Sequence, residues 1–141
     1  MEIADVRKRV QRRIDLARRD AVARRERSAL IESAYARFLS DVAEPLFRQL
    51  ENVLHAEGHR FRLETPKGSL RLSSERSPDE YIEIALDTQA TPPTVVGRAR
   101  HARGRRVIAD ERRLGDGEVS SLTDEVVLAF VVDALGPFVE R

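Results

Sequence analysis

The amino-acid sequence predicts an α+β fold: a long N-terminal helical (coiled-coil-like) arm, an antiparallel 4–5-strand meander, and a C-terminal helix packed on the sheet. Three observations lead to this prediction. Residues 2–57 contain one proline and no glycine, as long helices do. Apolar and polar residues then alternate from Phe61 onwards, which is the period of a strand. Finally, an apolar block over 126–135 ends at a Gly-Pro pair, which is typical of a helix and its stop.

The N-terminal segment is rich in Ala, Arg, Leu and Glu, and its apolar or small side chains recur at steps of three, four and seven. That spacing fits the seam of a coiled coil, interrupted at Arg24. The seam consists of Ile3, Val10, Ile14, Ala17, Ala21, Ser28, Ile31, Tyr35, Phe38 and Val42. Because Pro45 cannot continue a helix, we expect a second helix capped by Asp41 and ending at Glu57. We therefore divide the chain into an arm, 1–40, and an α+β domain, 41–141.

Alternating residues predict the sheet. We expect strands over 61–64, 70–73, 81–87, 95–101 and 105–111, with tight turns at 65–68 and at Arg103-Gly104. The third strand carries Glu83 and Asp87 on one face, which we interpret as a solvated face with carboxylates opposite arginines.

The last helix begins after Ser121, which with Asp124 three residues later forms a capping box. Its apolar residues cover more than one face and leave mainly Asp124, Glu125 and Asp133 for water. Such a helix must be covered on two sides, by the sheet and by either another helix or a partner chain.

Composition excludes several classes of protein. Lys and Arg number 25 against 24 Asp and Glu, so the chain is not a uniformly basic nucleic-acid binder. There is no cysteine, which excludes disulfides, thiolate-bound zinc, iron–sulfur clusters and thiol catalysis. No apolar run reaches the roughly 18–20 residues that span a membrane, and the first residues do not resemble a signal peptide. We therefore expect a cytoplasmic protein without membrane contact.

Neutrality on average hides segregated charge. Residues 1–28 carry ten basic and five acidic side chains, and residues 95–113 carry seven and two. Residues 114–141 carry one basic and six acidic side chains. The chain is therefore polarised, with two basic blocks and an acidic end.

Catalytic and cofactor motifs are missing. His55 and His59 flank a carboxylate, but a zinc-protease helix needs Glu directly after the first His, and Gly58 breaks the helix between them. No glycine-rich phosphate loop and no nucleophile elbow occurs. We expect no enzyme, cofactor or metal; an enzyme would need a pocket that gathers residues such as His101, Glu83 and Asp110.

Five arginines cluster around the second predicted hairpin. They are Arg98, Arg100, Arg103, Arg105 and Arg106. Guanidinium groups match phosphate and carboxylate oxygens, so this tip is a candidate contact for nucleic acid or an acidic protein. The cluster contains no aromatic residue to stack on bases, and its arginines could equally pair with carboxylates of the same chain.

The arginines of the arm have a different pattern. The doublets at 12–13, 18–19 and 24–25 wrap around a helix, because six residues rotate by about 240°. They therefore suit a solvated helix whose apolar seam meets a partner, most simply a second copy in a homodimer. The candidates for this contact are Ile3, Val10, Ile14, Ile31, Tyr35 and Phe38. The sequence thus favours a non-enzymatic self-associating interaction or scaffold module, with a nucleic-acid-binding protein as the alternative.

Overall fold

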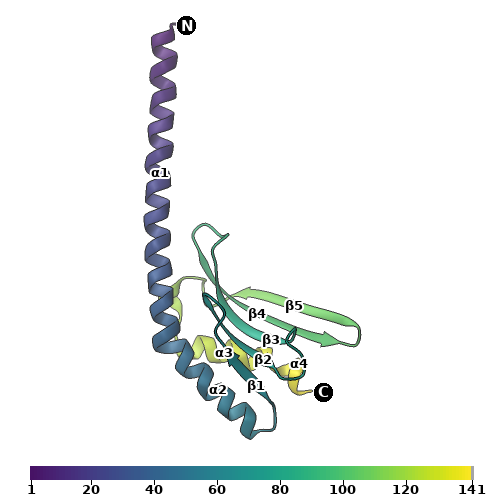
Figure 1. Cartoon of the computed structure of the whole chain (residues 1–141). Coiled ribbons are helices and arrows are strands. Elements are labelled where there is room, and N and C mark those ends of the chain that lie inside the picture. Colours follow the sequence, from purple (N-terminus) through teal and green to yellow (C-terminus); the bar gives the residue numbers. More distant parts are fainter. Residues whose placement is uncertain (141) are drawn as a thin grey trace.

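The computed structural model describes residues 1–140, and it confirms the predicted α+β fold (Figure 1). The helices are α1 (Ile3–Phe38), α2 (Glu44–Ala56), α3 (Asp124–Ala134) and α4 (Gly136–Val139). The strands are β1 (Phe61–Glu64), β2 (Ser69–Ser74), β3 (Tyr81–Asp87), β4 (Thr94–Arg103) and β5 (Arg106–Arg113). All five predicted strands are present, within three residues of the expected bounds.

Helix α1 is an arm that leaves the rest of the molecule (Figure 1). It has 36 residues and so is about 54 Å long at 1.5 Å per residue. Every residue from Met1 to Asp20 is exposed, whereas Tyr35 and Phe38 at the other end are buried. Only the C-terminal end of the arm is therefore anchored in the domain.

The connection between α1 and α2 differs from the expected break. The chain stays helical through a π-helical turn, Leu39–Ala43, and bends there without a side-chain cap from Asp41. Pro45 explains the wide turn, since it has no N–H to donate and its ring would crowd the carbonyl of Asp41 in a regular helix. The bend points Phe38 and Phe47 into the same core.

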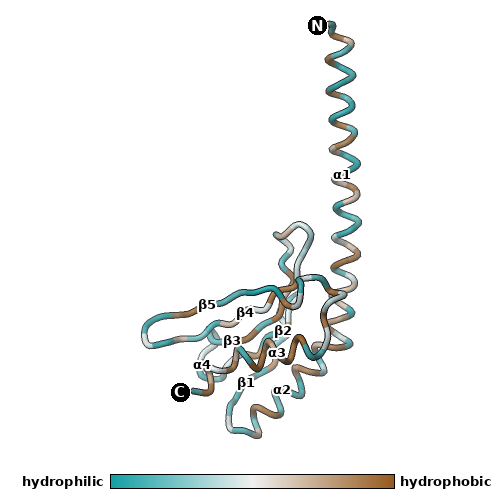
Figure 2. Tube along the Cα trace, turned by 180° about the vertical axis from the view of Figure 1, so that it is seen from behind, coloured by the Kyte–Doolittle hydropathy of each residue, from teal (hydrophilic) through white to brown (hydrophobic). Residues whose placement is uncertain are grey.

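The strands form one antiparallel meander in the order β1-β2-β3-β4-β5. One face of the sheet, which we call the inner face, is covered by α2 and α3 (Figures 1 and 2). Alternate strand residues point to this face, and Leu72, Ile82, Ile84 and Val95 on it are fully buried. The opposite, outer face has no helix laid across it.

The N-cap of helix α3 lies two residues later than the proposed one. Thr123, not Ser121, is the N-cap, and its hydroxyl oxygen accepts a hydrogen bond from the Val126 N–H at 3.2 Å. Ser121 belongs to a 3₁₀ turn and donates to the Glu118 carbonyl at 2.7 Å instead. The buried, extended Leu122 separates the two, so the residue in front of the helix is Thr123.

The Gly136-Pro137 pair does end α3, but one more helical turn follows. This turn, α4, buries Phe138 against Phe61 with the two ring centroids 5.5 Å apart, edge to face. Asp124, Glu125 and Asp133 are exposed, as expected for the polar side of α3.

Gly97 lets α3 approach the sheet closely. A Cβ atom at this position would lie 2.5–2.8 Å from three atoms of the Phe130 ring, which is closer than carbon atoms pack. Phe130 is buried under β4, so its ring would have to move out of its packed position to admit this atom.

We therefore expect Gly97→Ala to lower the free energy of unfolding by about 1–3 kcal/mol, the usual cost of overpacking a core. Gly136→Ala is the matched control, because a Cβ there meets only a side-chain oxygen at 3.9 Å. Urea denaturation of both variants measures the difference. Equal stabilities would contradict the close packing of α3 on β4.

Candidate functional site

The structure splits the residues predicted for self-association into two groups. Ile3, Val10 and Ile14 are 80%, 52% and 42% exposed, although all three are large and apolar. Tyr35 and Phe38 lie in the core of their own domain, and Ile31 is half-buried. The uncovered part of the seam is therefore the N-terminal part, and Val6 beside it, which is not among the predicted residues, is exposed as well.

The exposed and buried parts of the seam form one continuous stripe along α1, from Ile3 to Phe38. From the middle of the helix onwards the seam residues Ala21, Ser28 and Ile31 are half-buried while most of their neighbours are exposed. The loop that joins β3 and β4 stands beside this stretch in both views (Figures 1 and 2). A hollow of about 430 Å³ lies between Ala21–Glu32 on the helix and Thr88–Pro93 on the loop. The domain thus covers the stripe from Ala21 onwards and leaves Ile3 to Ala17 open.

The clustered arginines do not form one surface. Strand alternation places Arg98 and Arg100 on the outer face, where both are half-buried. Arg103 and Arg106 are cross-strand partners on the opposite face, at the tip of the β4–β5 hairpin, and Arg105 lies in the turn. The three tip arginines are exposed and form no ion pair within the described residues.

A row of alternating charges crosses the whole outer face. The register places Glu64, Arg71, Glu83, Arg98 and Glu111 side by side, one on each strand from β1 to β5. Arg71 bonds to Glu83 at 3.1 Å, and Arg98 lies 3.5 Å from Glu111. The predicted opposition of carboxylates and arginines is therefore present.

This row is less solvated than the sequence suggested. Glu83 is only 5% exposed, and the C-terminal part of α1 borders it, since Tyr35 and Glu83 line the same hollow. Neighbouring side chains on the sheet add to its cover: Arg71 bonds to it and stacks on the Tyr81 ring, with the guanidinium carbon 3.9 Å from the ring centroid. The Nε atoms of Arg71 and Arg100 are buried here without a hydrogen-bond acceptor in the described residues. The arrangement stabilises the sheet register rather than presenting a free anion site.

Tyr35 links the arm to this face. Its hydroxyl donates to the Gly68 carbonyl at 3.0 Å, in the turn between β1 and β2. Burial raises the pKa of this phenol well above its usual value, Glu83 raises it further, and Arg98 acts in the opposite direction. The hydroxyl is therefore a fixed, protonated donor that ties α1 to the sheet.

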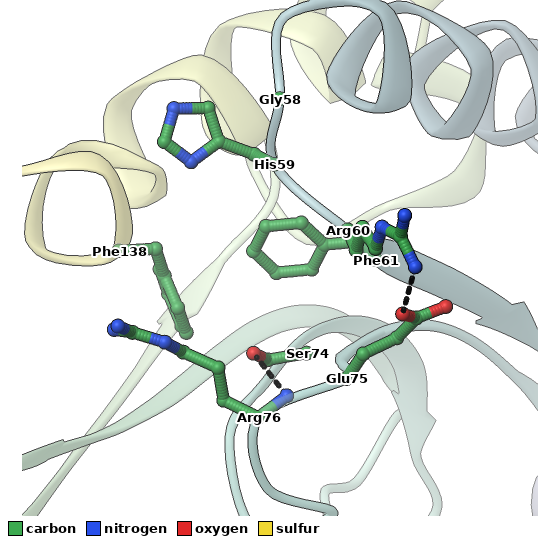
Figure 3. A pocket seen from close by; sticks show the side chains of 8 residues that line it. All are labelled: Gly58, His59, Arg60, Phe61, Ser74, Glu75, Arg76 and Phe138. Carbon is green, nitrogen blue, oxygen red and sulfur yellow. Dashed lines mark hydrogen bonds and ion pairs between the residues drawn. The ribbon is translucent and has the colours of Figure 1, made fainter.

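A separate hollow of about 400 Å³ lies where α2 joins β1 (Figure 3). Phe61 and Phe138 form its apolar wall, and His59, Arg60 and Arg76 contribute its basic groups. Glu75 lies 4.0 Å from Arg60. The negative end of α2 adjoins the same hollow, so its potential has no single sign, and we assign it no ligand.

The proposed catalytic grouping is not brought together. His101 and Asp110 line one hollow of about 330 Å³ on the inner face, whereas Glu83 is on the outer face. The Nε2 atom of His55 forms a hydrogen bond with the Phe61 carbonyl oxygen at 2.7 Å. Within residues 1–140, no three His, Asp or Glu side chains lie together as a metal would require. No helix in that part of the chain is long and apolar enough to cross a membrane.

No known protein family, curated protein or solved structure matches this chain.

The burial of Glu83 within the charge row predicts how two substitutions in this row change the stability of the protein. Glu83→Gln removes the negative charge that lies between Arg71 and Arg98, so we expect unfolding to become easier by about 1–3 kcal/mol. Glu111→Gln, in the same row but with a side chain 49% exposed, should cost less than about 1 kcal/mol. Chemical denaturation compares them. If the Glu111 variant were the less stable of the two, burial of Glu83 would not be the deciding factor.

Proposed function

We propose that this protein is a non-enzymatic self-associating module, in which the open stripe of α1 pairs two copies of the chain. The observation that carries the proposal is the continuity of the stripe. Its C-terminal part is packed in the core of the domain, and its N-terminal part repeats the same spacing without any cover. Figure 2 shows hydrophobic segments recurring along the whole arm.

Helix energetics support the same proposal. In proteins most helical stability comes from packing of an apolar face, and isolated helices are marginal in water. The first twenty residues of the arm have no such packing within the chain. Pairing would remove Ile3, Val6, Val10 and Ile14 from water, and burying an aliphatic side chain of this size contributes about 1.5–3 kcal/mol.

A second candidate function rests on the tip of the β4–β5 hairpin. Arg103, Arg105 and Arg106 are exposed, unpaired within the described residues, and held at one end of the sheet. Such a tip suits phosphate groups of a nucleic acid, which arginine binds through paired N–H donors. It supplies three cationic groups and no aromatic ring, so binding would be weak and insensitive to sequence.

Self-association is tested by charging the open stripe. We expect Val10→Glu with Ile14→Glu to convert a dimer to a monomer, measured by light scattering at tens of micromolar. The control is Leu16→Glu with Val22→Glu, which places the same charges on exposed apolar positions off the stripe. A monomeric parent protein would refute the proposal, and so would equal loss of association in the two double variants.

Nucleic-acid binding is tested by removing two tip charges. We expect Arg103→Ala with Arg105→Ala to weaken binding to single-stranded DNA and to lower the salt dependence by about one counterion per arginine. Arg18→Ala with Arg19→Ala, on the arm, is the matched control of equal charge. Fluorescence anisotropy at low salt is the measurement; no binding by the parent chain would remove this function.

A further inference from the structure

We infer that the two arms pair antiparallel, with Ile3 of one chain opposite Ala21 of the other, so that the two domains lie at opposite ends of the pair. This inference rests on the proposed self-association and adds the direction and register of the partner. Three features of the described residues carry it: the position of the domain on the stripe, the length of the open stripe, and the charged residues within it.

The domain occupies the place that a parallel partner would need. Beyond Ala21 the stripe faces its own chain, first beside the β3–β4 loop and then in the core at Tyr35 and Phe38. A parallel partner stays level with α1 along the stripe, so its residues after 21 would run into this loop. Both domains would also crowd the same end. An antiparallel partner instead ends where the loop begins.

The length of the open stripe agrees with an antiparallel partner that ends near the β3–β4 loop. Ala21 is the first half-buried residue of the arm, and all residues before it are exposed. With Ile3 opposite the partner's Ala21, the overlap runs from 3 to 21 in each chain, about 27 Å at 1.5 Å per residue. The partner's Met1 is then level with Ala23, near the start of the stretch Ala21–Glu32 that adjoins the loop.

Charged residues within the seam decide the direction independently. The heptad positions of the seam are occupied in order by Ile3, Arg7, Val10, Ile14, Ala17, Ala21 and Arg24. In a parallel pair each position faces itself, so Arg7 meets Arg7 and Arg24 meets Arg24, both repulsive. Two flanking contacts of Arg13 with the partner's Arg18 would add to this.

The antiparallel register removes both repulsive layers. Arg7 lies opposite the partner's Ala17, so its aliphatic stem can cover the small residue while the guanidinium reaches water. Arg24 falls beyond the partner's first residue. The remaining layers pair Ile3 with the partner's Ala21 and Val10 with the partner's Ile14. One like-charge contact remains, Arg13 with its own copy. In the parallel pair, two Asp20–Arg25 contacts between opposite charges would offset the two Arg13–Arg18 contacts but not the two arginine layers within the seam.

Spin labels measure the direction directly, because the chain has no native cysteine. Asp5→Cys, Arg12→Cys and Arg19→Cys each place one label on the side of the arm away from the stripe. In the antiparallel register position 12 lies level with its copy, whereas positions 5 and 19 are each displaced from their copies by 14 residues, about 21 Å along the axis. We therefore expect pulsed dipolar spectroscopy to give the shortest distance at 12 and longer, similar distances at 5 and 19.

Mixed dimers complete the test. A dimer of one chain labelled at 5 and another at 19 should give a short distance like that at 12. Equal distances at all three positions would overturn the antiparallel inference but leave self-association intact. Absence of dipolar coupling at every position, with a monomer mass in light scattering, would overturn both the inference and the proposed function.

Discussion

The structure depends on one packing arrangement: the C-terminal end of α1 buries Tyr35 and Phe38 in one core with residues of α2, α3 and the sheet. The π-helical turn after Phe38 redirects the chain so that α2 can lie on the same core. The Tyr35 hydroxyl adds a hydrogen bond to the turn between β1 and β2. Because this anchor fixes the C-terminal end of α1, it also fixes the direction in which the uncovered N-terminal part of the arm projects.

On the outer face of the sheet, the central contacts between strands are made by charged side chains rather than by apolar ones. Glu83 is nearly inaccessible, and Arg71 and Arg98 on the neighbouring strands lie opposite it. A one-residue slip of either strand pair would move an arginine away from this carboxylate and to the other face of the sheet. The alternating row therefore reinforces the register of the meander that the apolar inner face also specifies. It also accounts for Arg98, one of the arginines that the sequence offered as contacts for a partner.

Most of the fold could be predicted because its signals are local. Strand alternation, the turn residues and the apolar block before Gly136 each depend on neighbours in the chain. The errors arose where tertiary packing chose between local options. Because Leu122 is buried before the helix begins, Thr123 rather than Ser121 is the N-cap of α3. The chain stays helical through Asp41, and the bend there places Phe38 and Phe47 in the same core.

The candidate site was less predictable for the same reason. The heptad spacing is identical in the covered and the open parts of the seam, so the sequence could not separate Tyr35 and Phe38 from Ile3 and Val10. The signal that could have separated them is size, since aromatic residues occur only in the covered part. Arg98 and Arg100 were likewise grouped with the tip because strand alternation, not distance along the chain, assigns them to the outer face.

Strand β5 has a consequence for how copies of this chain can meet. It is the last strand of the meander, and almost every residue in it is exposed. Such an edge offers unpaired backbone donors and acceptors to any other strand, which is the usual route to uncontrolled aggregation. Here Arg106, Asp110, Glu111, Arg112 and Arg113 give the edge charges of both signs. An added strand would have to place its own side chains against these charges, so the composition of β5 disfavours edge-to-edge joining of sheets from different molecules.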